Sequence, residues 1–335
     1  MKMKLLFVVA LLLACHGTRA DSLFTDPYAK PMDMQLKLPL DELVRKRRDR
    51  HTVAGVLTVD GEVFNVLVTP RGKSRLDRCT FPPLWIEFDK SEVKDTLFHK
   101  QKRLKLVTHC KNNLQRRGLL AAEMLAYRIM NVLTDYSYRA RAVRMQYVDE
   151  KDRPREHEAF FIEHKKRLAK RLDLTEVEAK SIKRIALDPN ATALQSLFHY
   201  LIGNTDFSFV RGPEGDECCH NIVPMQNEDG VVFPMAYDFD SSGIVNPPYS
   251  APAQNLGLRR FTQRKYRGYC QHNEELEIAR QTLIAAKPRV MQMVAEFDDV
   301  ANLNRSKTAD FIDRFYGTIE SDRKFTKDLL QRCRD

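Results

Sequence analysis

The sequence predicts an α+β protein with a β-rich N-terminal lobe and a mainly helical C-terminal lobe. Two observations support this prediction. Apolar and polar residues alternate with the period of a strand over much of residues 51–160, and apolar residues recur at helical spacing over much of residues 161–335. The chain has 335 residues, of which 43% are hydrophobic, so it is long enough to bury a core and to form two lobes.

Residues 1–20 have the pattern of a secretory signal peptide. Two early lysines precede an apolar run at residues 5–14, and small residues surround the end of the segment at Ala20. The run is too short for a transmembrane helix, which needs about 20 residues, and no later stretch is as apolar. We therefore expect a secreted or periplasmic protein with no transmembrane segment. As an alternative, residues 12–15 resemble a bacterial lipobox, which would anchor the protein through a lipid on Cys15.

Cleavage of either kind leaves six cysteines free to pair, because Cys15 is either removed or lipidated: Cys79, Cys110, Cys218, Cys219, Cys270 and Cys333. Exported proteins keep disulfide bonds, and an even number of cysteines is what a fully paired set would contain. The sequence alone does not choose a connectivity. The adjacent pair Cys218 and Cys219, followed by His220, has an alternative interpretation as part of a zinc site. No CxxC or HExxH motif accompanies it, so disulfide pairing is favoured.

The composition limits the class of partner. The chain contains 55 Lys and Arg and 45 Asp and Glu, a formal net charge of +10, which suits an anionic partner. Charge does not decide between a nucleotide, a lipid headgroup and an acidic glycan. We expect no nucleic acid, because the short basic patches belong to no recognised nucleic-acid-binding module. With 13 Gly and 15 Pro, the chain is not collagen-like or of low complexity.

The N-terminal lobe is predicted to follow a lead-in segment at residues 21–50. That segment contains three prolines, and its basic run at residues 45–48 is typical of a solvated helix face. An antiparallel sheet is expected next, with Asp60 and Gly61 as a hairpin turn. Its strands are predicted at residues 53–59, 62–69, 84–88, 103–109, 141–147 and 158–162. A helix with an apolar stripe is predicted at residues 119–132.

The C-terminal lobe is predicted at residues 161–335. Its segments show helical spacing of apolar residues without an internal repeat. Helices are expected at residues 165–171, 191–202, 274–286, 289–297, 307–316 and 321–333.

The densest polar run follows the predicted helix at residues 191–202. It comprises residues 203–206 (Gly-Asn-Thr-Asp), Asn221, and residues 237–240 (Tyr-Asp-Phe-Asp). Phosphoryl transfer from a nucleotide needs a carboxylate that accepts or orients the hydroxyl proton. It also needs carboxylate and amide oxygens that hold Mg²⁺. The run supplies both kinds of group, although each residue taken singly is also typical of a turn or a solvent loop.

Together these residues resemble the protein-kinase-like superfamily, specifically the spore-coat CotH-type kinase branch. Residues 203–206, Asn221 and residues 237–240 are similar to its GN-x-D … N … D-x-D arrangement. In the N-terminal half, residues 71–74 (Arg-Gly-Lys-Ser) and the strand after them are similar to its RG-x-S motif. The resemblance covers most of residues 55–240.

The resemblance implies a two-lobed protein-kinase-like fold and an ATP-dependent phosphotransferase. ATP or another nucleotide, with Mg²⁺ or Mn²⁺, would modify a hydroxyl of an unknown protein or glycan acceptor. The resemblance implies Asp206 as the catalytic base and Asn221 and Asp238 as metal ligands, with Asp240 as a further candidate ligand. It implies that Glu163 lies beside the nucleotide, at the hinge between the lobes.

The ion pair typical of kinases is assigned to Lys105, on a strand, and Glu123, on the helix. Arg71 and Lys73 complete the predicted nucleotide-binding set. The lysine that the branch usually places after its RG-x-S motif is missing, so Lys73 or Arg75 is the alternative partner of Glu123. The missing lysine also leaves open an alternative function. This is a catalytically silent pseudokinase-like protein, or an anion-binding or glycan-binding protein of the cell envelope.

A basic cluster after Asp240 is the predicted substrate or phosphate site, because arginine makes bidentate contacts with anions. Its arginines are Arg259, Arg260, Arg264 and Arg267. The alternative interpretation is a solvated basic loop held by Cys270.

Overall fold

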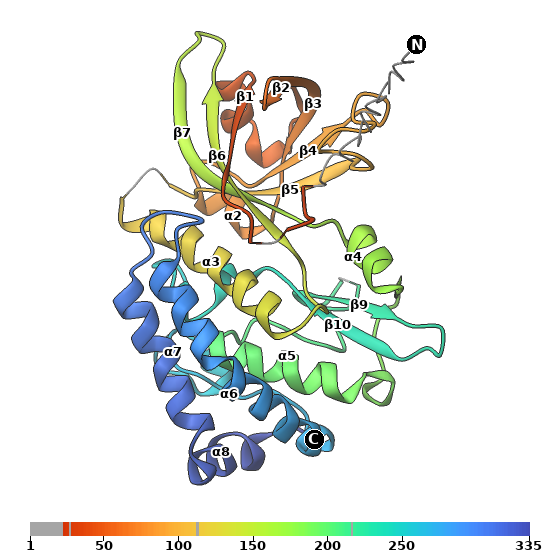
Figure 1. Ribbon diagram of the computed structural model, residues 1–335, viewed down its shortest axis with the longest axis vertical. Coiled ribbons are helices and arrows are strands. Elements are labelled where there is room, and N and C mark those ends of the chain that lie inside the picture. The colour runs from red at the N-terminus through yellow and green to blue at the C-terminus, as the bar shows by residue number, and fades with distance from the viewer. Residues whose placement is uncertain (1–22, 27, 112–113, 216) are drawn as a thin grey trace, which may run out of the picture.

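The computed structural model describes residues 23–335 except residues 27, 112, 113 and 216. The predicted signal peptide and Cys15 lie outside the described residues. Strands from the first half of the chain form one end of the molecule, and helices from the second half form the other (Figure 1). None of the described helices is long and apolar enough to cross a membrane.

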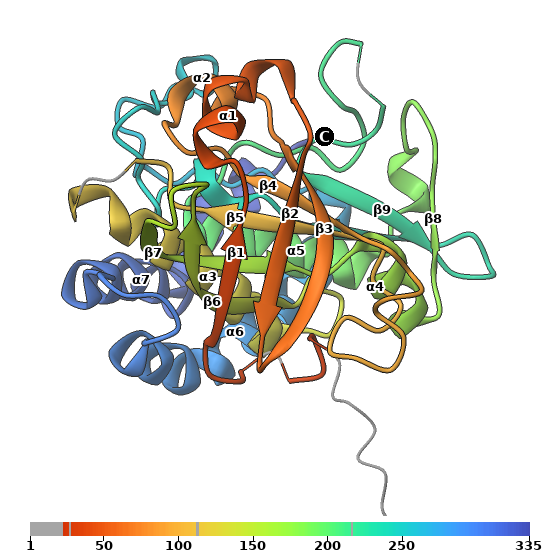
Figure 2. The ribbon, with the colours of Figure 1, turned by 90° about the horizontal axis from the view of Figure 1, so that it is seen from above.

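Seven strands form a closed barrel in the order β1-β2-β3-β4-β5-β7-β6. Neighbouring strands are antiparallel, except that β1 runs parallel to β6. Figure 2 shows β1, β2 and β3 side by side on the surface of the barrel. The strands are β1 (Met32–Lys37), β2 (Val53–Val59), β3 (Glu62–Pro70), β4 (Leu84–Phe88), β5 (Arg103–Thr108), β6 (Ala140–Val148) and β7 (Pro154–Ile162).

The predicted two-lobed protein-kinase-like fold is wrong, because the strands close into a mixed barrel, with a separate small sheet beyond it. The strand that closes the barrel is β1, which lies inside the segment predicted as a lead-in. Leu36 of β1 pairs with Leu57 of β2 on one side and with Tyr147 of β6 on the other. Closure satisfies the backbone N–H and C=O groups that two open edges would leave unpaired. A prediction that began the sheet at residue 53 could not include this strand.

The inward face of the barrel explains why the strands form where they do. In β1, β3 and β4, buried apolar residues alternate with less buried ones, as the period-two pattern predicts. Leu36 in β1, Leu57 in β2, Val68 in β3 and Ile86 in β4 are each at most 1% exposed. The bounds predicted for β2 and β4 are confirmed, and the other predicted strands differ at their ends by a few residues. Two short helices lie beside the barrel, α1 (Leu40–Arg45) and α2 (Ser74–Arg78).

The second part of the molecule combines a small sheet with the longer helices. The sheet has the order β10-β9-β8 and was not predicted; its strands are β8 (Thr175–Glu176), β9 (Ile222–Gln226) and β10 (Val232–Ala236). The helices are α3 (Leu114–Leu133), α4 (Lys165–Leu172), α5 (Pro189–Ile202), α6 (Asn273–Glu296), α7 (Arg305–Ile319) and α8 (Asp322–Asp328). The two helices predicted at residues 274–297 form the single helix α6, with Pro288 inside it.

Helix α3 lies between the barrel and the other helices (Figure 1). Its buried residues, which include Met124 and Ile129, belong to one core with Phe160 of the barrel and Leu197 of α5. A separate core fills the barrel. Because α3 packs on both parts, residues at its surface can contact a site that lies between them.

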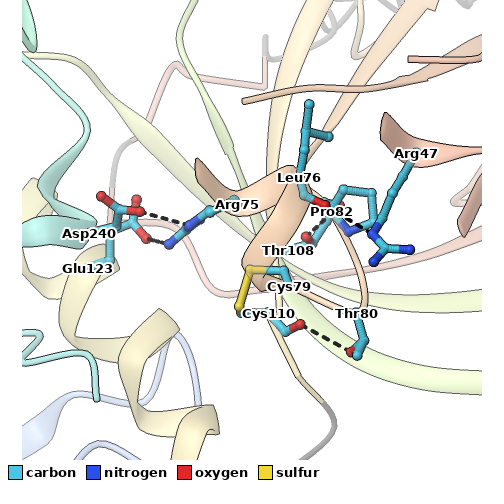
Figure 3. The surroundings of a disulfide bond; sticks show 10 residues. All are labelled: Arg47, Arg75, Leu76, Cys79, Thr80, Pro82, Thr108, Cys110, Glu123 and Asp240. Carbon is cyan, nitrogen blue, oxygen red and sulfur yellow. Dashed lines mark hydrogen bonds and ion pairs between the residues drawn. A yellow bond between two sulfur atoms is a disulfide. The ribbon is translucent and has the colours of Figure 1, made fainter. Parts of the chain in front are cut away.

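The described cysteines form three disulfide bonds, which confirms the predicted disulfide pairing. Cys79 is bonded to Cys110, Cys270 to Cys333, and Cys218 to its neighbour Cys219. The first bond ties the end of α2 to the residues that follow β5 (Figure 3). It therefore holds α2, and the residues that α2 carries, against the barrel.

Candidate functional site

A cleft of about 770 Å³ lies where the barrel meets the second part of the molecule. It brings together most of the residues that the sequence singled out. The barrel side contributes Arg71, Lys73, Arg75, Trp85 and Lys105, and the other side contributes Asp206, His220, Asn221, Tyr237, Asp238 and Asp240.

Asp206 is positioned by the end of α5. The helix is capped at its start by Asp188 and ends at Gly203, whose φ of 65° lies in the left-handed region that glycine adopts readily. Next, the buried side chain of Asn204 accepts a hydrogen bond from the backbone N–H of Asp206 (2.8 Å). Asn204 also lies 3.2 Å from Nδ1 of the buried His199. These contacts fix the backbone that presents the Asp206 carboxylate to the cleft.

Asn221 and Asp238 lie at the ends of two paired strands. Asn221 precedes β9 and Asp238 follows β10, and the backbone N–H of Tyr237 donates to the Asn221 carbonyl (3.1 Å). Both residues have positive φ, 54° and 62°, which the short side chains of Asn and Asp tolerate better than most. The small sheet thus places both polar side chains on the wall that carries Asp206.

Asp206 and Asn221 are in direct contact. The amide nitrogen of Asn221 donates to the backbone carbonyl of Asp206 (2.7 Å) and to its carboxylate (3.3 Å). The amide oxygen of Asn221 is therefore the atom that could hold a cation. With the Asp238 carboxylate it offers the oxygen donors that Mg²⁺ prefers. Within the described ranges, no group of three or more His, Cys, Asp or Glu side chains is arranged to hold a metal ion.

His220 is a site residue that the sequence analysis considered only as part of a zinc site with Cys218 and Cys219. Its Nε2 lies 2.7 Å from Oδ1 of Asp206, and this hydrogen bond raises the pKa of His220. The signal in the sequence for its role beside Asp206 was its place directly before Asn221. Tyr127 was missed, because it lies within the apolar stripe of α3. Its hydroxyl accepts a hydrogen bond from the backbone N–H of Asp238 (3.0 Å).

Arg75, rather than Lys105, forms the ion pair with Glu123. Its guanidinium lies 2.8 Å from Glu123 and 2.8 Å from Asp240, so it joins two acidic residues from different segments (Figure 3). Arg75 was the alternative partner in the sequence analysis. Burial raises the pKa of Asp240 to about 7, although Arg75 opposes this shift. Because Asp240 is paired with Arg75, it is less suited to bind a metal ion than Asp238.

Lys105 lies on the barrel wall of the cleft beside two aromatic rings. Its Nζ is 4.6 Å from the ring centre of Tyr237 and 5.8 Å from that of Trp85. Burial, together with the neighbouring charge of Arg71, lowers the pKa of Lys105 to about 8. The guanidinium carbon of Arg71 also lies near the Trp85 ring, 5.1 Å from the ring centre.

Glu163 does not line the cleft. It follows β7, is 1% exposed, and is held by Arg171 of α4 at 3.0 Å and by the backbone N–H of Arg139 at 3.2 Å. Its observed contacts are those of a buried link between the barrel and α4.

The four arginines after Asp240 do not form one site in the structure. Arg264 donates to the backbone carbonyls of Leu201 (3.0 Å) and Phe311 (2.6 Å), so it holds the end of α5 against α7. Arg267 donates to the carbonyl of Thr205, next to Asp206. The other two arginines, Arg259 and Arg260, are exposed and do not line the cleft.

The charges of the cleft are divided between its two walls. Residues of the barrel side supply the cations Arg71, Lys73 and Lys105, and the opposite wall supplies the carboxylates of Asp206 and Asp238. This division suits a phosphate bound to a divalent cation, because the cation would meet carboxylates and the phosphate oxygens would meet Lys and Arg. Comparisons with models of protein families and with curated proteins give no match for this chain.

Proposed function

We propose that the protein is an exported phosphotransferase that binds a nucleotide with Mg²⁺ or Mn²⁺ in the cleft and phosphorylates a hydroxyl group. The observation that carries this proposal is the convergence of Asp206, Asn221 and Asp238 on one wall, opposite the cations of the barrel. The disulfide bonds support the exported location. The resemblance to the CotH-type branch is part of the proposal for these motif residues, but not for the fold.

In this proposal Asp206 is the catalytic base. Its side chain is 46% exposed, and His220 and Asn221 hold it from two sides. It accepts the proton of the attacking hydroxyl, while Arg71 and Lys73 contact the phosphates. The amide oxygen of Asn221 and the carboxylate of Asp238 hold the divalent cation, which neutralises phosphate charge when it is bound.

The test is thermal unfolding of the oxidised protein with and without ATP and Mn²⁺. A ligand at about 100 times its dissociation constant stabilises the folded state by roughly 2.7 kcal/mol, which raises the midpoint clearly. We expect this rise in the wild type and its loss in Asp238→Ala. The matched control is Asp310→Ala, an exposed aspartate of α7 that does not line the cleft. Absence of a rise in the wild type would overturn the proposal.

A catalytically silent anion-binding protein is the second candidate. The observation that favours it is that Glu123 and Asp240 both pair with Arg75. The cleft therefore lacks the lysine–glutamate ion pair that kinases use. This candidate predicts that binding of ATP persists in EDTA, because the barrel cations would then hold the phosphates without a metal ion.

A further inference from the structure

A second cavity of about 510 Å³ adjoins the cleft. The two cavities share four lining residues, Asp206, Pro213, His220 and Ser241. The Asp206 carboxylate therefore lies at their junction, with the proposed nucleotide site on one side and the second cavity on the other. The barrel cations Arg71, Lys73 and Lys105 do not line the second cavity, so a molecule there would reach the proposed base from a space separate from the proposed phosphate site.

The second cavity carries positive charge. Among the described residues that line it, Asp206 supplies the one carboxylate, whereas Arg211 and Arg267 supply two guanidinium groups. Arg211 is exposed. The Nε of Arg267 is buried and has no hydrogen-bond partner in the described part of the chain. The Arg211 guanidinium is therefore the group that an anion in the cavity could contact directly, and the charge of Arg267 adds to the attraction.

The remaining lining residues suit a sugar. Ser208, Ser241 and Asn255 bring hydroxyl and amide groups, and Phe261 brings an aromatic surface. The volume lies in the range of small-molecule sites, roughly 300–1,000 Å³. None of the lining residues belongs to the strands β1 to β10, so no strand edge is presented to an extended peptide.

We propose that this cavity is the acceptor site and binds an anionic sugar, a monosaccharide unit that carries a carboxylate or a phosphate. This inference rests on the proposed phosphotransferase function. In the reaction, the sugar hydroxyl oxygen forms a bond to the terminal phosphorus of a nucleoside triphosphate. The bond from that phosphorus to the nucleoside diphosphate oxygen breaks, and the hydroxyl proton passes to the Asp206 carboxylate.

Calorimetric titration of the purified, oxidised chain tests this inference with three sugars. Methyl β-D-glucuronide and glucose 6-phosphate carry the two kinds of anion, and methyl β-D-glucoside is the neutral control. We expect the better of the two charged sugars to bind about tenfold or more tightly than the neutral one, and their order identifies the anion. Arg211→Ala should remove this advantage, whereas Arg323→Ala, an exposed arginine of α8 outside both cavities, should keep it. Asn255→Ala should weaken binding of all three sugars.

The titration can overturn the inference in two ways. One is equal affinity for charged and neutral sugars, or an advantage unchanged by Arg211→Ala. The other is tighter binding of an acidic serine peptide than of either charged sugar, lost in the same variant, which would replace the sugar by a peptide. The ATP and Mn²⁺ unfolding test on the same samples separates the two proposals. Sugar binding without an ATP effect overturns the role as an acceptor site, and an ATP effect without sugar binding overturns only the sugar inference.

Discussion

Arg75 and Glu123 form a buried ion pair, 2.8 Å long, that links α2 beside the barrel to α3 beneath it. Their side chains are 13% and 1% exposed, and the same guanidinium reaches Asp240 after β10. One side chain therefore connects three segments that are distant in the sequence. The pair lies at the cleft, so it affects both the stability of the fold and the shape of the proposed site.

Removal of the arginine should be strongly destabilising. Arg75→Met leaves Glu123 buried without its partner, and loss of one member of a buried pair typically costs about 3–5 kcal/mol. The matched control is Arg48→Ala, whose pair with Asp77 is 67% exposed on both sides and should contribute about 0–1 kcal/mol. Urea unfolding of both variants measures the two losses. Equal losses would show that burial of the Arg75 pair is not what matters.

The Cys79–Cys110 bond should support both stability and nucleotide binding. Replacing both cysteines by serine should lower the free energy of unfolding by about 2–5 kcal/mol, because the unfolded chain is no longer constrained. The bond also holds α2, which carries Arg75, so the ATP-dependent rise in midpoint should shrink. Replacing Cys270 and Cys333 is the control, since that bond lies away from the residues of the cleft and should change stability alone.

Stability should fall in mild acid because of His199. Burial lowers the pKa of this histidine to about 3, from an ordinary value near 6.5, so between these values the unfolded state binds a proton that the folded state does not. Stability therefore rises with pH through this window, and the loss from pH 7 to pH 5 should be about 2 kcal/mol from this group.

Urea unfolding at pH 7 and pH 5 measures the effect. His199→Gln should be less stable than the wild type at pH 7 but should lose less between the two pH values. His51→Gln is the control, because His51 is 40% exposed and lies on the outside of the barrel part. A pH dependence that His199→Gln leaves unchanged would contradict this assignment.

Asp206→Asn should separate binding from catalysis. The amide has nearly the same shape, so the ATP and Mn²⁺ effect on the midpoint should remain, but it cannot accept the hydroxyl proton. Loss of a general base typically lowers kcat by 10²–10⁴-fold. ATP hydrolysis in the absence of an acceptor gives the readout, with Asp310→Ala as the control. Loss of the ATP effect in Asp206→Asn would instead indicate a role for Asp206 in binding.

Neighbouring residues in the sequence predict most of the local elements and many of the residues of the proposed site. The period of two in β2 and β4, and the helical spacing of apolar residues in α5, depend on neighbouring residues alone, so they can be interpreted from the sequence. The polar run from Asp206 to Asp240 was likewise visible, because it interrupts apolar patterns. These signals can be interpreted without knowing which distant segments pack against them.

The closure of the barrel and the pairing of charges depend on contacts between segments that are distant in the sequence. The β1 strand closes the barrel because it pairs on one side with β2, the next strand along the chain, and on the other with β6, which is far away in the sequence. Arg75 pairs with Glu123, and Lys105 lies by Tyr237 instead, because the segment that carries each side chain, α2 for Arg75 and β5 for Lys105, decides which groups it can reach. Arg264 holds the end of α5 for the same reason. Ion pairs form between side chains that are close in the folded structure, and separation in the sequence says little about which side chains those are.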